Sequence, residues 1–168
     1  MTEKEKLNEE LKTLAADICG QLLAKKYTIA TAESCTGGLI AKTITDNSGV
    51  SASFGYGVVT YSNEAKMKIL QVKADTLNEH GAVSKETAVE MAAGLKSLSG
   101  ADFALAVTGI AGPCGGSADK PVGLVYIGLE FPEGNAVGKY IFKGDRNAVR
   151  LQTAEAALSM VNDVLDKL

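Results

Sequence analysis

Apolar residues recur at steps of three or four near both ends of the chain, which is the period of a helix with one buried face. The apolar positions are Leu7, Leu11, Leu14, Ile18 and Leu22 in the first segment, and Leu151, Ala154, Leu158, Val161 and Leu165 in the second. Asp145 is a suitable N-cap for the second helix. The pattern predicts two long amphipathic helices, one at each end.

Short runs of β-branched and apolar residues predict strands between these helices. Three of them cover Thr28 to Thr31, Gly55 to Tyr61 and Phe103 to Thr108. Two more, VGLVYIGLE and AVGKYIF, flank the turn-forming sequence Pro-Glu-Gly-Asn. The last two strands are therefore expected to form an antiparallel hairpin.

Further helices are predicted between the second and third strands. They cover Asn63 to Ile69, Ala74 to Glu79 with Gly81 as a stop, and a segment that begins after Ser84 and ends before Gly100. The order of elements favours one mixed sheet with helices packed over it. We expect a single three-layer α/β/α domain over residues 1–168, whose strand order the sequence leaves open.

Composition supports a soluble globular protein and narrows its partners. The chain has 168 residues, of which 46% are hydrophobic and 22% charged, and its net charge is −3. A protein that neutralises DNA phosphates normally has a basic surplus, so we expect no nucleic-acid partner. The N-terminal segment has no uninterrupted apolar stretch, which predicts no membrane contact and a cytoplasmic location. An odd count of three cysteines then indicates free thiols.

The chain contains one histidine, His80, and no CxxC spacing. A single imidazole cannot build a zinc cluster or a two-histidine metal face. We therefore expect no metal, and no other cofactor is indicated.

The sharpest local signal is the segment Glu33-Ser34-Cys35-Thr36-Gly37-Gly38, which joins the first predicted strand to a predicted helix. Such a turn gathers unpaired backbone N–H groups at the positive end of a helix, which suits a phosphate or an oxyanion. The spacing is neither GxxxxGK[ST] nor GxGxxG nor GxSxG. In the simpler alternative, Ser34 or Thr36 only caps the helix.

A nucleophilic Ser34 needs a base, and the histidine count limits the choice. His80 lies in NEHG at a predicted helix end, where an imidazole is ordinarily solvated. The alternative base is a lysine whose pKa burial lowers, for which Lys66 is the first candidate and Lys42 the second. Tyr61 could relay a proton or orient that base.

Cys35 is a competing nucleophile, because a thiol of lowered pKa reacts faster than a hydroxyl. Neighbouring side chains diverge, so only one of Ser34 and Cys35 is expected to face a cavity. We favour Ser34.

A second polar segment, Thr108-Gly109-Ile110-Ala111-Gly112-Pro113-Cys114-Gly115-Gly116-Ser117, follows a strand expected to be central. Its glycines would let backbone approach a ligand closely, or it is simply a flexible loop. Arg146, which opens the last helix, could bind a phosphate or pair with Asp145 or Glu33.

Five segments in this order and spacing resemble the CinA C-terminal domain family. They are TAESCTGG, VVTYSNEAK, LNEHGAVS, VTGIAGPCGGSADKPVG and FKGDR, and the resemblance runs from about Thr28 to Arg150. Longer members have a further N-terminal domain, so we expect this chain to match the stand-alone form. The family usually reads GPDGG where this chain has Cys114 within GPCGG, which puts affinity or specificity in question.

The resemblance implies hydrolysis of the carboxamide of nicotinamide mononucleotide (NMN) to nicotinic acid mononucleotide and ammonia, without a cofactor. It also implies that Ser34 is the nucleophile and that Tyr61 and Lys66 assist it. The residues expected to contact the substrate are Glu33, Cys35, Thr36, Gly37, Gly38, Thr108, Gly109, Gly112 and Arg146. A non-catalytic nucleotide-binding module is the alternative, and a homodimer is expected from the resemblance.

Overall fold

The structure, a computed structural model, describes residues 1–168. Its helices are α1 (Glu3–Lys25), α2 (Leu39–Thr45), the short 3-10 helix η1 (Val50–Ala52), α3 (Asn63–Leu70), α4 (Ala74–His80), α5 (Lys85–Ser99) and α6 (Arg146–Leu165). Its strands are β1 (Ile29–Glu33), β2 (Phe54–Val59), β3 (Phe103–Gly109), β4 (Leu124–Phe131) and β5 (Gly134–Ile141).

The strands form one mixed sheet in the order β2-β1-β3-β4-β5. β2, β1 and β3 run parallel, whereas β4 is antiparallel to both β3 and β5. The carboxyl ends of β1, β2 and β3 therefore meet at one edge of the sheet. Open α/β sheets bind their ligands at this edge.

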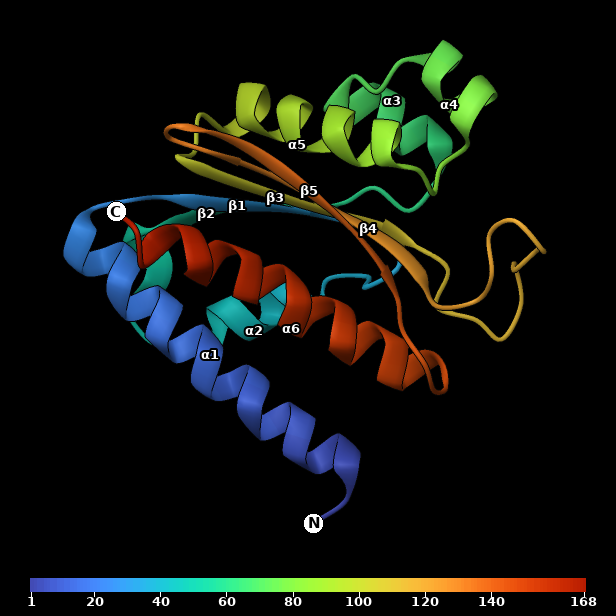
Figure 1. Cartoon of the computed structure of the whole chain (residues 1–168). Coiled ribbons are helices and arrows are strands. Elements are labelled where there is room, and N and C mark those ends of the chain that lie inside the picture. The colour runs from blue at the N-terminus through green and yellow to red at the C-terminus, as the bar shows by residue number, and fades with distance from the viewer.

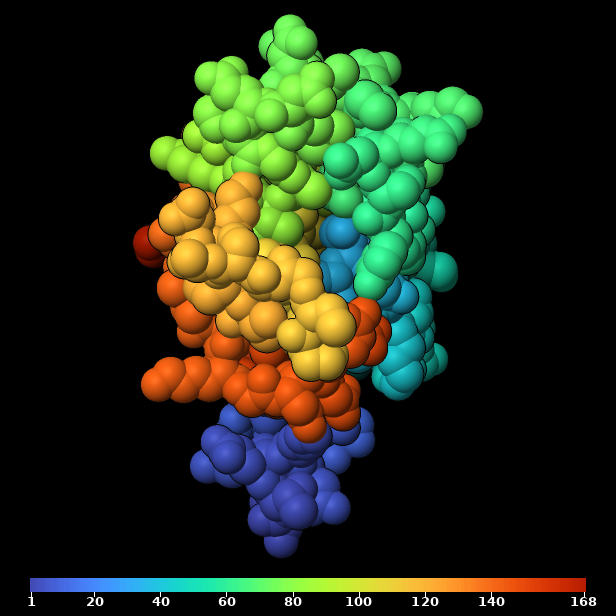
Figure 2. Space-filling model, turned by 90° about the vertical axis from the view of Figure 1, so that its right-hand side faces the viewer, coloured from blue at the N-terminus to red at the C-terminus, as the bar shows by residue number.

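Helices cover both faces of the sheet (Figure 1). α1, α2 and α6 lie on one face, and α3, α4 and α5 lie on the other. The first turns of α1 project beyond the rest of the molecule (Figures 1 and 2). None of the helices combines the length and the apolar character that a bilayer crossing requires.

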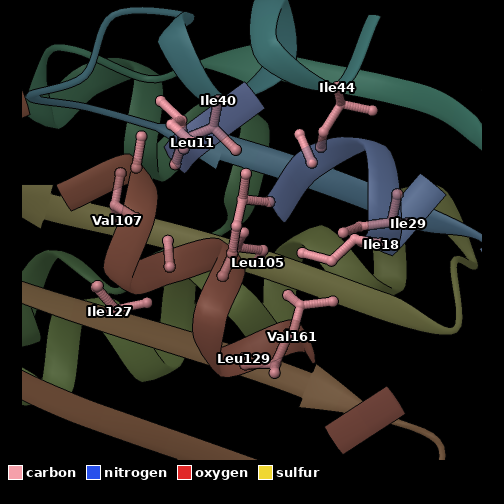
Figure 3. Close-up of a cluster of buried hydrophobic side chains, with 14 of the residues drawn as sticks. Leu11, Ile18, Ile29, Ile40, Ile44, Leu105, Val107, Ile127, Leu129 and Val161 are labelled. Carbon is pink, nitrogen blue, oxygen red and sulfur yellow. The ribbon is translucent and has the colours of Figure 1, made fainter. Parts of the chain in front are cut away.

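The two faces of the sheet are packed differently. Large side chains such as Leu105, Ile127 and Leu129 point toward α1, α2 and α6 and form the larger core cluster (Figure 3). The opposite face presents mainly alanines from β1 and β3, which are Ala30, Ala32, Ala104 and Ala106. A Cβ at Gly128 would stand only 2.6 Å from the carbonyl oxygen of Ala88 in α5. Small residues thus let α5, and α3 packed on it, lie close to the sheet.

The predicted architecture is confirmed, including the three layers, the mixed sheet and the antiparallel hairpin. The predicted caps at Ser84 and Asp145 are confirmed as well. The first strand differs from the predicted Thr28 to Thr31, because it extends to Glu33. Val107 accepts a hydrogen bond from the backbone of Ser34, so sheet pairing continues to the edge of the turn. Ser34 consequently follows the last residue of a buried strand.

Two helical glycines should respond oppositely to alanine. A Cβ at Gly94 in α5 would stand 1.8 Å from the carbonyl oxygen of Leu70 in α3, whereas nothing lies within 4 Å of one at Gly20 in α1. We expect Gly94→Ala to destabilise the protein by about 1–3 kcal/mol through overpacking. Gly20→Ala should stabilise it by about 0.5–1 kcal/mol through helix propensity. Urea unfolding measures both, and a neutral Gly94→Ala would contradict the close packing of α3 on α5.

Candidate active site

A cavity of about 180 Å³ opens at the carboxyl ends of the parallel strands. It is lined by Ser34, Cys35, Tyr61, Lys66, Ala82, Val83, Thr108, Gly109, Ala111 and Arg146. Figure 2 looks onto this edge, where residues of the thirties, in blue, lie deep between the amber loop that follows β3 and the green segments around α3 and α4. Two wider hollows lie along the first half of α1, lined mostly by charged side chains. Neither contains a nucleophile beside a base.

The structure brings Ser34 and Lys66 together. The Lys66 Nζ lies 3.0 Å from the Ser34 Oγ. β1 leads directly into the serine, and the first turn of α3 supplies the lysine, whose helix is capped by Ser62. Both side chains are buried, and Lys66 is only 1% exposed. The candidate nucleophile and the candidate base are therefore within hydrogen-bond reach of each other in a buried site.

The surroundings of Lys66 favour its neutral form. Burial lowers the pKa of this amine, and no carboxylate forms an ion pair with it. The carbonyl oxygens of Thr60 and Tyr61 accept from Nζ at 2.8 and 3.3 Å. A neutral amine has two N–H bonds and one lone pair. Lys66 Nζ is placed as a donor to Ser34 Oγ, and when the amine is neutral with its hydrogens on the two carbonyls, its lone pair faces that hydroxyl.

The competing bases lie elsewhere. Lys42 is on the exposed side of α2 and forms an ion pair with Asp46 at 2.5 Å. His80 is partly exposed at the end of α4 beside Glu79 and Glu86, outside the cavity lining. Neither side chain contacts Ser34.

Cys35 lines the cavity but is unsuited to attack. Burial raises the pKa of its thiol to about 11, so the thiol stays protonated at neutral pH. A Cβ at Gly109 would stand 2.6 Å from the Val125 Cγ2 and 3.2 Å from the Cys35 Sγ, so glycine at this position leaves room for β4 and for the sulfur. All three cysteines are free, as predicted.

The turn after Ser34 differs from its prediction in one respect. The Glu33 carboxylate accepts hydrogen bonds from the backbone of Ile40 at 2.8 Å and Ala41 at 3.0 Å. An anion of the chain itself therefore occupies the start of α2, where the sequence suggested a ligand phosphate, and neither Ser34 nor Thr36 caps the helix. The N–H groups of Cys35 and Thr36 donate to no other residue of the chain, so they are available donors beside Ser34.

Arg146 and Tyr61 meet at the mouth of the cavity. The Arg146 guanidinium donates to the Tyr61 hydroxyl at 2.9 Å and to the Gly112 carbonyl at 2.8 Å. It pairs with neither Asp145 nor Glu33, contrary to one of the alternatives drawn from sequence. The Tyr61 hydroxyl contacts neither Ser34 nor Lys66, so only its backbone carbonyl touches the base.

Five of the residues expected to contact substrate do not line the cavity. Glu33 faces α2, Thr36 is fully buried, and Gly37 and Gly38 shape the turn with positive φ angles. Gly112 contributes its carbonyl to Arg146. The four that do line it are Cys35, Thr108, Gly109 and Arg146.

The sequence analysis did not identify Arg150 or the wall segment at Ala82 as parts of the site. Arg150 donates to the Thr36 carbonyl at 2.7 Å and so braces the turn. Arg150 lies four residues after Arg146, and this spacing could have indicated that both side chains lie on the same face of the helix. The Thr108 hydroxyl donates to the Ala82 carbonyl at 2.7 Å and fixes the segment that forms the opposite wall. No group of three or more His, Cys, Asp or Glu side chains is arranged to hold a metal ion.

The buried lysine should make stability depend on pH. Because its pKa in the folded chain lies below the ordinary 10.5, the unfolded chain binds more protons between those two values, and stability rises with pH across that window. We expect the free energy of unfolding of the wild type to increase relative to that of Lys66→Met as pH rises from neutral into the alkaline range. Urea unfolding of both proteins measures the difference. Lys42→Met, which removes an exposed amine, should run parallel to the wild type, and parallel curves for Lys66→Met would contradict a lowered pKa.

Solved structures with the same fold are known. The competence/damage inducible protein CihA from Agrobacterium tumefaciens superposes with a TM-score of 0.90 at 43% identity, with 94% of this chain and 96% of that chain covered. A competence-damaged protein (CinA) superfamily protein from Escherichia coli gives a TM-score of 0.89 at 31% identity, with 98% and 99% covered.

Curated relatives agree with this likeness. The chain is 52% identical over 150 residues to a CinA-like protein from Kosmotoga olearia and 54% identical over 151 residues to one from Geotalea daltonii. The alignments cover 89% and 90% of this chain but only 36% and 37% of those relatives. The chain thus spans about a third of their length. A model of the CinA C-terminal domain matches residues 11–165, and the chain belongs to that family.

Proposed function

We propose that this chain hydrolyses the carboxamide of NMN, giving nicotinic acid mononucleotide and ammonia, with Ser34 as nucleophile and Lys66 as base. The observation that carries the proposal is the 3.0 Å separation of Ser34 Oγ and Lys66 Nζ in a buried site without a countercharge. That pair supports the reaction class, and the resemblance of the sequence segments supports the substrate. The names of the relatives state no reaction.

Acylation begins with neutral Lys66. Its lone pair accepts the Ser34 proton while Oγ attacks the carboxamide carbon, and a tetrahedral oxyanion forms. The free N–H groups of Cys35 and Thr36 are the nearest unengaged donors in the chain sequence and would hold that oxyanion. The C–N bond then breaks, and protonated Lys66 returns its proton to the departing nitrogen, which leaves as ammonia.

Deacylation repeats the same steps with water. Lys66, neutral again, takes a proton from the water that attacks the acyl carbon. The bond from that carbon to Ser34 Oγ breaks, and the lysine proton restores the hydroxyl. The product is the pyridine carboxylate, and the enzyme regains its starting state.

The mouth of the cavity suits the phosphate end of the nucleotide. The cavity, at about 180 Å³, is the size of the pyridine carboxamide rather than of a whole nucleotide, so the ribose phosphate would extend toward Arg146. That guanidinium is bonded only to neutral oxygens, those of Tyr61 and Gly112. Exchange of these bonds for phosphate oxygens would replace neutral hydrogen bonds by charge-assisted ones.

A second candidate is a nucleotide-binding module that performs no hydrolysis. Cys114 favours it, because this exposed thiol stands where the family usually has a carboxylate. The Ser34–Lys66 geometry is unaffected by that substitution, since Cys114 is absent from the cavity lining. Hydrolysis is therefore the better supported of the two.

Ammonia release from NMN tests the nucleophile and the base. We expect Ser34→Ala and Lys66→Met each to lower kcat by about 10³-fold or more, because each removes a partner in one proton transfer. Lys42→Met, which removes an exposed lysine, should stay within about twofold of the wild type. NMN binding by calorimetry with no product from the wild type would favour the non-catalytic module.

Arg146 should act on binding and less on chemistry. Loss of a charge-assisted hydrogen bond costs about 1.5–3 kcal/mol, so we expect Arg146→Gln to raise KM for NMN about 10- to 100-fold with a smaller change in kcat. Nicotinamide riboside, which lacks the phosphate, should show the same KM with both enzymes. An equal loss for both substrates would place the phosphate elsewhere.

A further inference from the structure

Glu33 and Ser34 are neighbours whose side chains leave the end of β1 on opposite faces of the sheet. Ala30 and Ala32 belong to the core beneath α5, and Ile29 belongs to the core beneath α1 and α6. Alternation places Ser34 on the α5 face, where Lys66 reaches it, and Glu33 on the α2 face. The nucleophile and a buried carboxylate therefore lie on consecutive residues without sharing a space.

The Glu33 carboxylate joins the two ends of the nucleophile turn. One oxygen accepts from the backbone of Ile40 and the other from that of Ala41, at 2.8 and 3.0 Å. The N-cap residue of α2 is Gly38, which has no side chain to offer, and the first turn of α2 contains no acidic residue. Glu33, at the end of β1, thus accepts hydrogen bonds from the first N–H groups of α2, as an N-cap side chain does in other helices.

These bonds restrict the segment between them. The chain leaves the sheet at Glu33 and enters the first turn of α2 at Ile40, so the carboxylate closes a short loop that contains Ser34. Gly37 and Gly38 adopt φ angles of 60° and 106°, which non-glycine residues rarely adopt. Two further bonds, from Ser34 N to the Val107 carbonyl and from Arg150 to the Thr36 carbonyl, hold the loop at other points.

The charge of Glu33 is satisfied away from the base. The side chain is 1% exposed and forms no salt bridge, and its partners are the two N–H groups at the positive end of α2. A carboxylate that reached Lys66 would stabilise the ammonium form and remove the base. The orientation of Glu33 therefore preserves the neutral amine as well as the turn.

We propose that Glu33 is a positioning residue that fixes the Ser34 hydroxyl at hydrogen-bond distance from Lys66 by tying the end of β1 to the start of α2. The proposal rests on the proposed function and adds to it a residue that touches neither substrate nor base. A displacement of reacting groups by about 1 Å can lower a rate about 100-fold. A turn released at one end would allow such a displacement.

The test compares Glu33→Gln with Asp102→Asn. Glu33→Gln keeps the shape of the side chain but presents an amide NH₂ to one of the two N–H donors, so the clamp is lost on that side. Asp102 is the matched control, because its carboxylate also accepts from a backbone N–H, that of Thr28, at the opposite edge of the same sheet. Glu33→Gln is expected to lose some stability, measured by urea unfolding, and Asp102→Asn to lose less, because a single oxygen of Asp102 accepts both bonds from Thr28 and an amide oxygen can replace it.

Only Glu33→Gln should affect the chemistry. With NMN we expect its kcat to fall about 10-fold or more, with KM within about twofold and the midpoint of the pH–rate profile unchanged, because Lys66 keeps its surroundings. Glu33→Asp, which retains the charge on a shorter side chain, should recover part of the loss. Asp102→Asn should retain wild-type kcat.

A fluorophosphonate that labels reactive serines separates this proposal from the proposed function. Glu33→Gln should label to one group per chain, as the wild type does, but at a rate lowered about as much as kcat, and Ser34→Ala should not label. If the wild type labels but releases no ammonia from NMN, the substrate assignment fails while the labelling rates still test Glu33. If Glu33→Gln labels as fast as the wild type, the proposal is overturned. It is also overturned if Glu33→Gln labels more slowly only because fewer of its chains can be labelled at all.

Discussion

The site depends on one buried lysine that has no countercharge. Taking an ammonium out of water is unfavourable, and a protein normally compensates with a carboxylate. Here the compensation consists of two backbone carbonyls, those of Thr60 and Tyr61, and the Ser34 hydroxyl. Carbonyl oxygens can satisfy the N–H bonds of a neutral amine without stabilising its charge as a carboxylate would. The arrangement therefore lowers the pKa of an amine that is ordinarily protonated and so favours its neutral form, in a chain with a single histidine outside the cavity.

The packing of the sheet makes this burial possible. Lys66 lies in the first turn of α3, and α3 reaches the end of β1 because α5 beneath it rests on alanines and on Gly128. Gly94 lets the end of α3 touch α5 along the backbone. The large aliphatic side chains lie on the other face of the sheet, where they form the larger core cluster beneath α1 and α6 (Figure 3). The distribution of small and large residues along β1 and β3 is thus what lets α3 come close enough to bring Lys66 to Ser34.

Much of this could be predicted from sequence, and the failures have specific causes. The spacing of apolar residues predicted nearly every helix and strand, because this spacing is a local property of the sequence. Leu7 to Leu22 is an example for a helix, and Phe103 to Thr108 is one for a strand. The histidine count directed attention to lysine, but the choice between Lys42 and Lys66 required the packing of α3 on the sheet, which is a long-range property. Glu33 is among the residues expected from the sequence to contact the substrate, yet its carboxylate faces α2. Its true direction follows from strand alternation, which the sequence could have shown only if β1 had been extended to residue 33.

The N-termini of α2 and α6 both lie near the cavity, but they carry different charged side chains. Glu33 binds the start of α2, and Arg146 is the first residue of α6. At α2 the positive end is occupied by the Glu33 carboxylate, which accepts from the first N–H groups of the helix. At α6 the N-cap is Asp145, which is tied to Lys4, and the next residue, Arg146, turns its guanidinium to the mouth of the cavity. Net positive charge is thereby concentrated at the mouth, where a phosphate would arrive. An interior without a charged partner favours the unprotonated form of Lys66, and a cationic mouth would favour an anionic substrate. One pocket can meet both requirements because the Glu33 carboxylate binds the start of α2 and the Arg146 guanidinium belongs to α6.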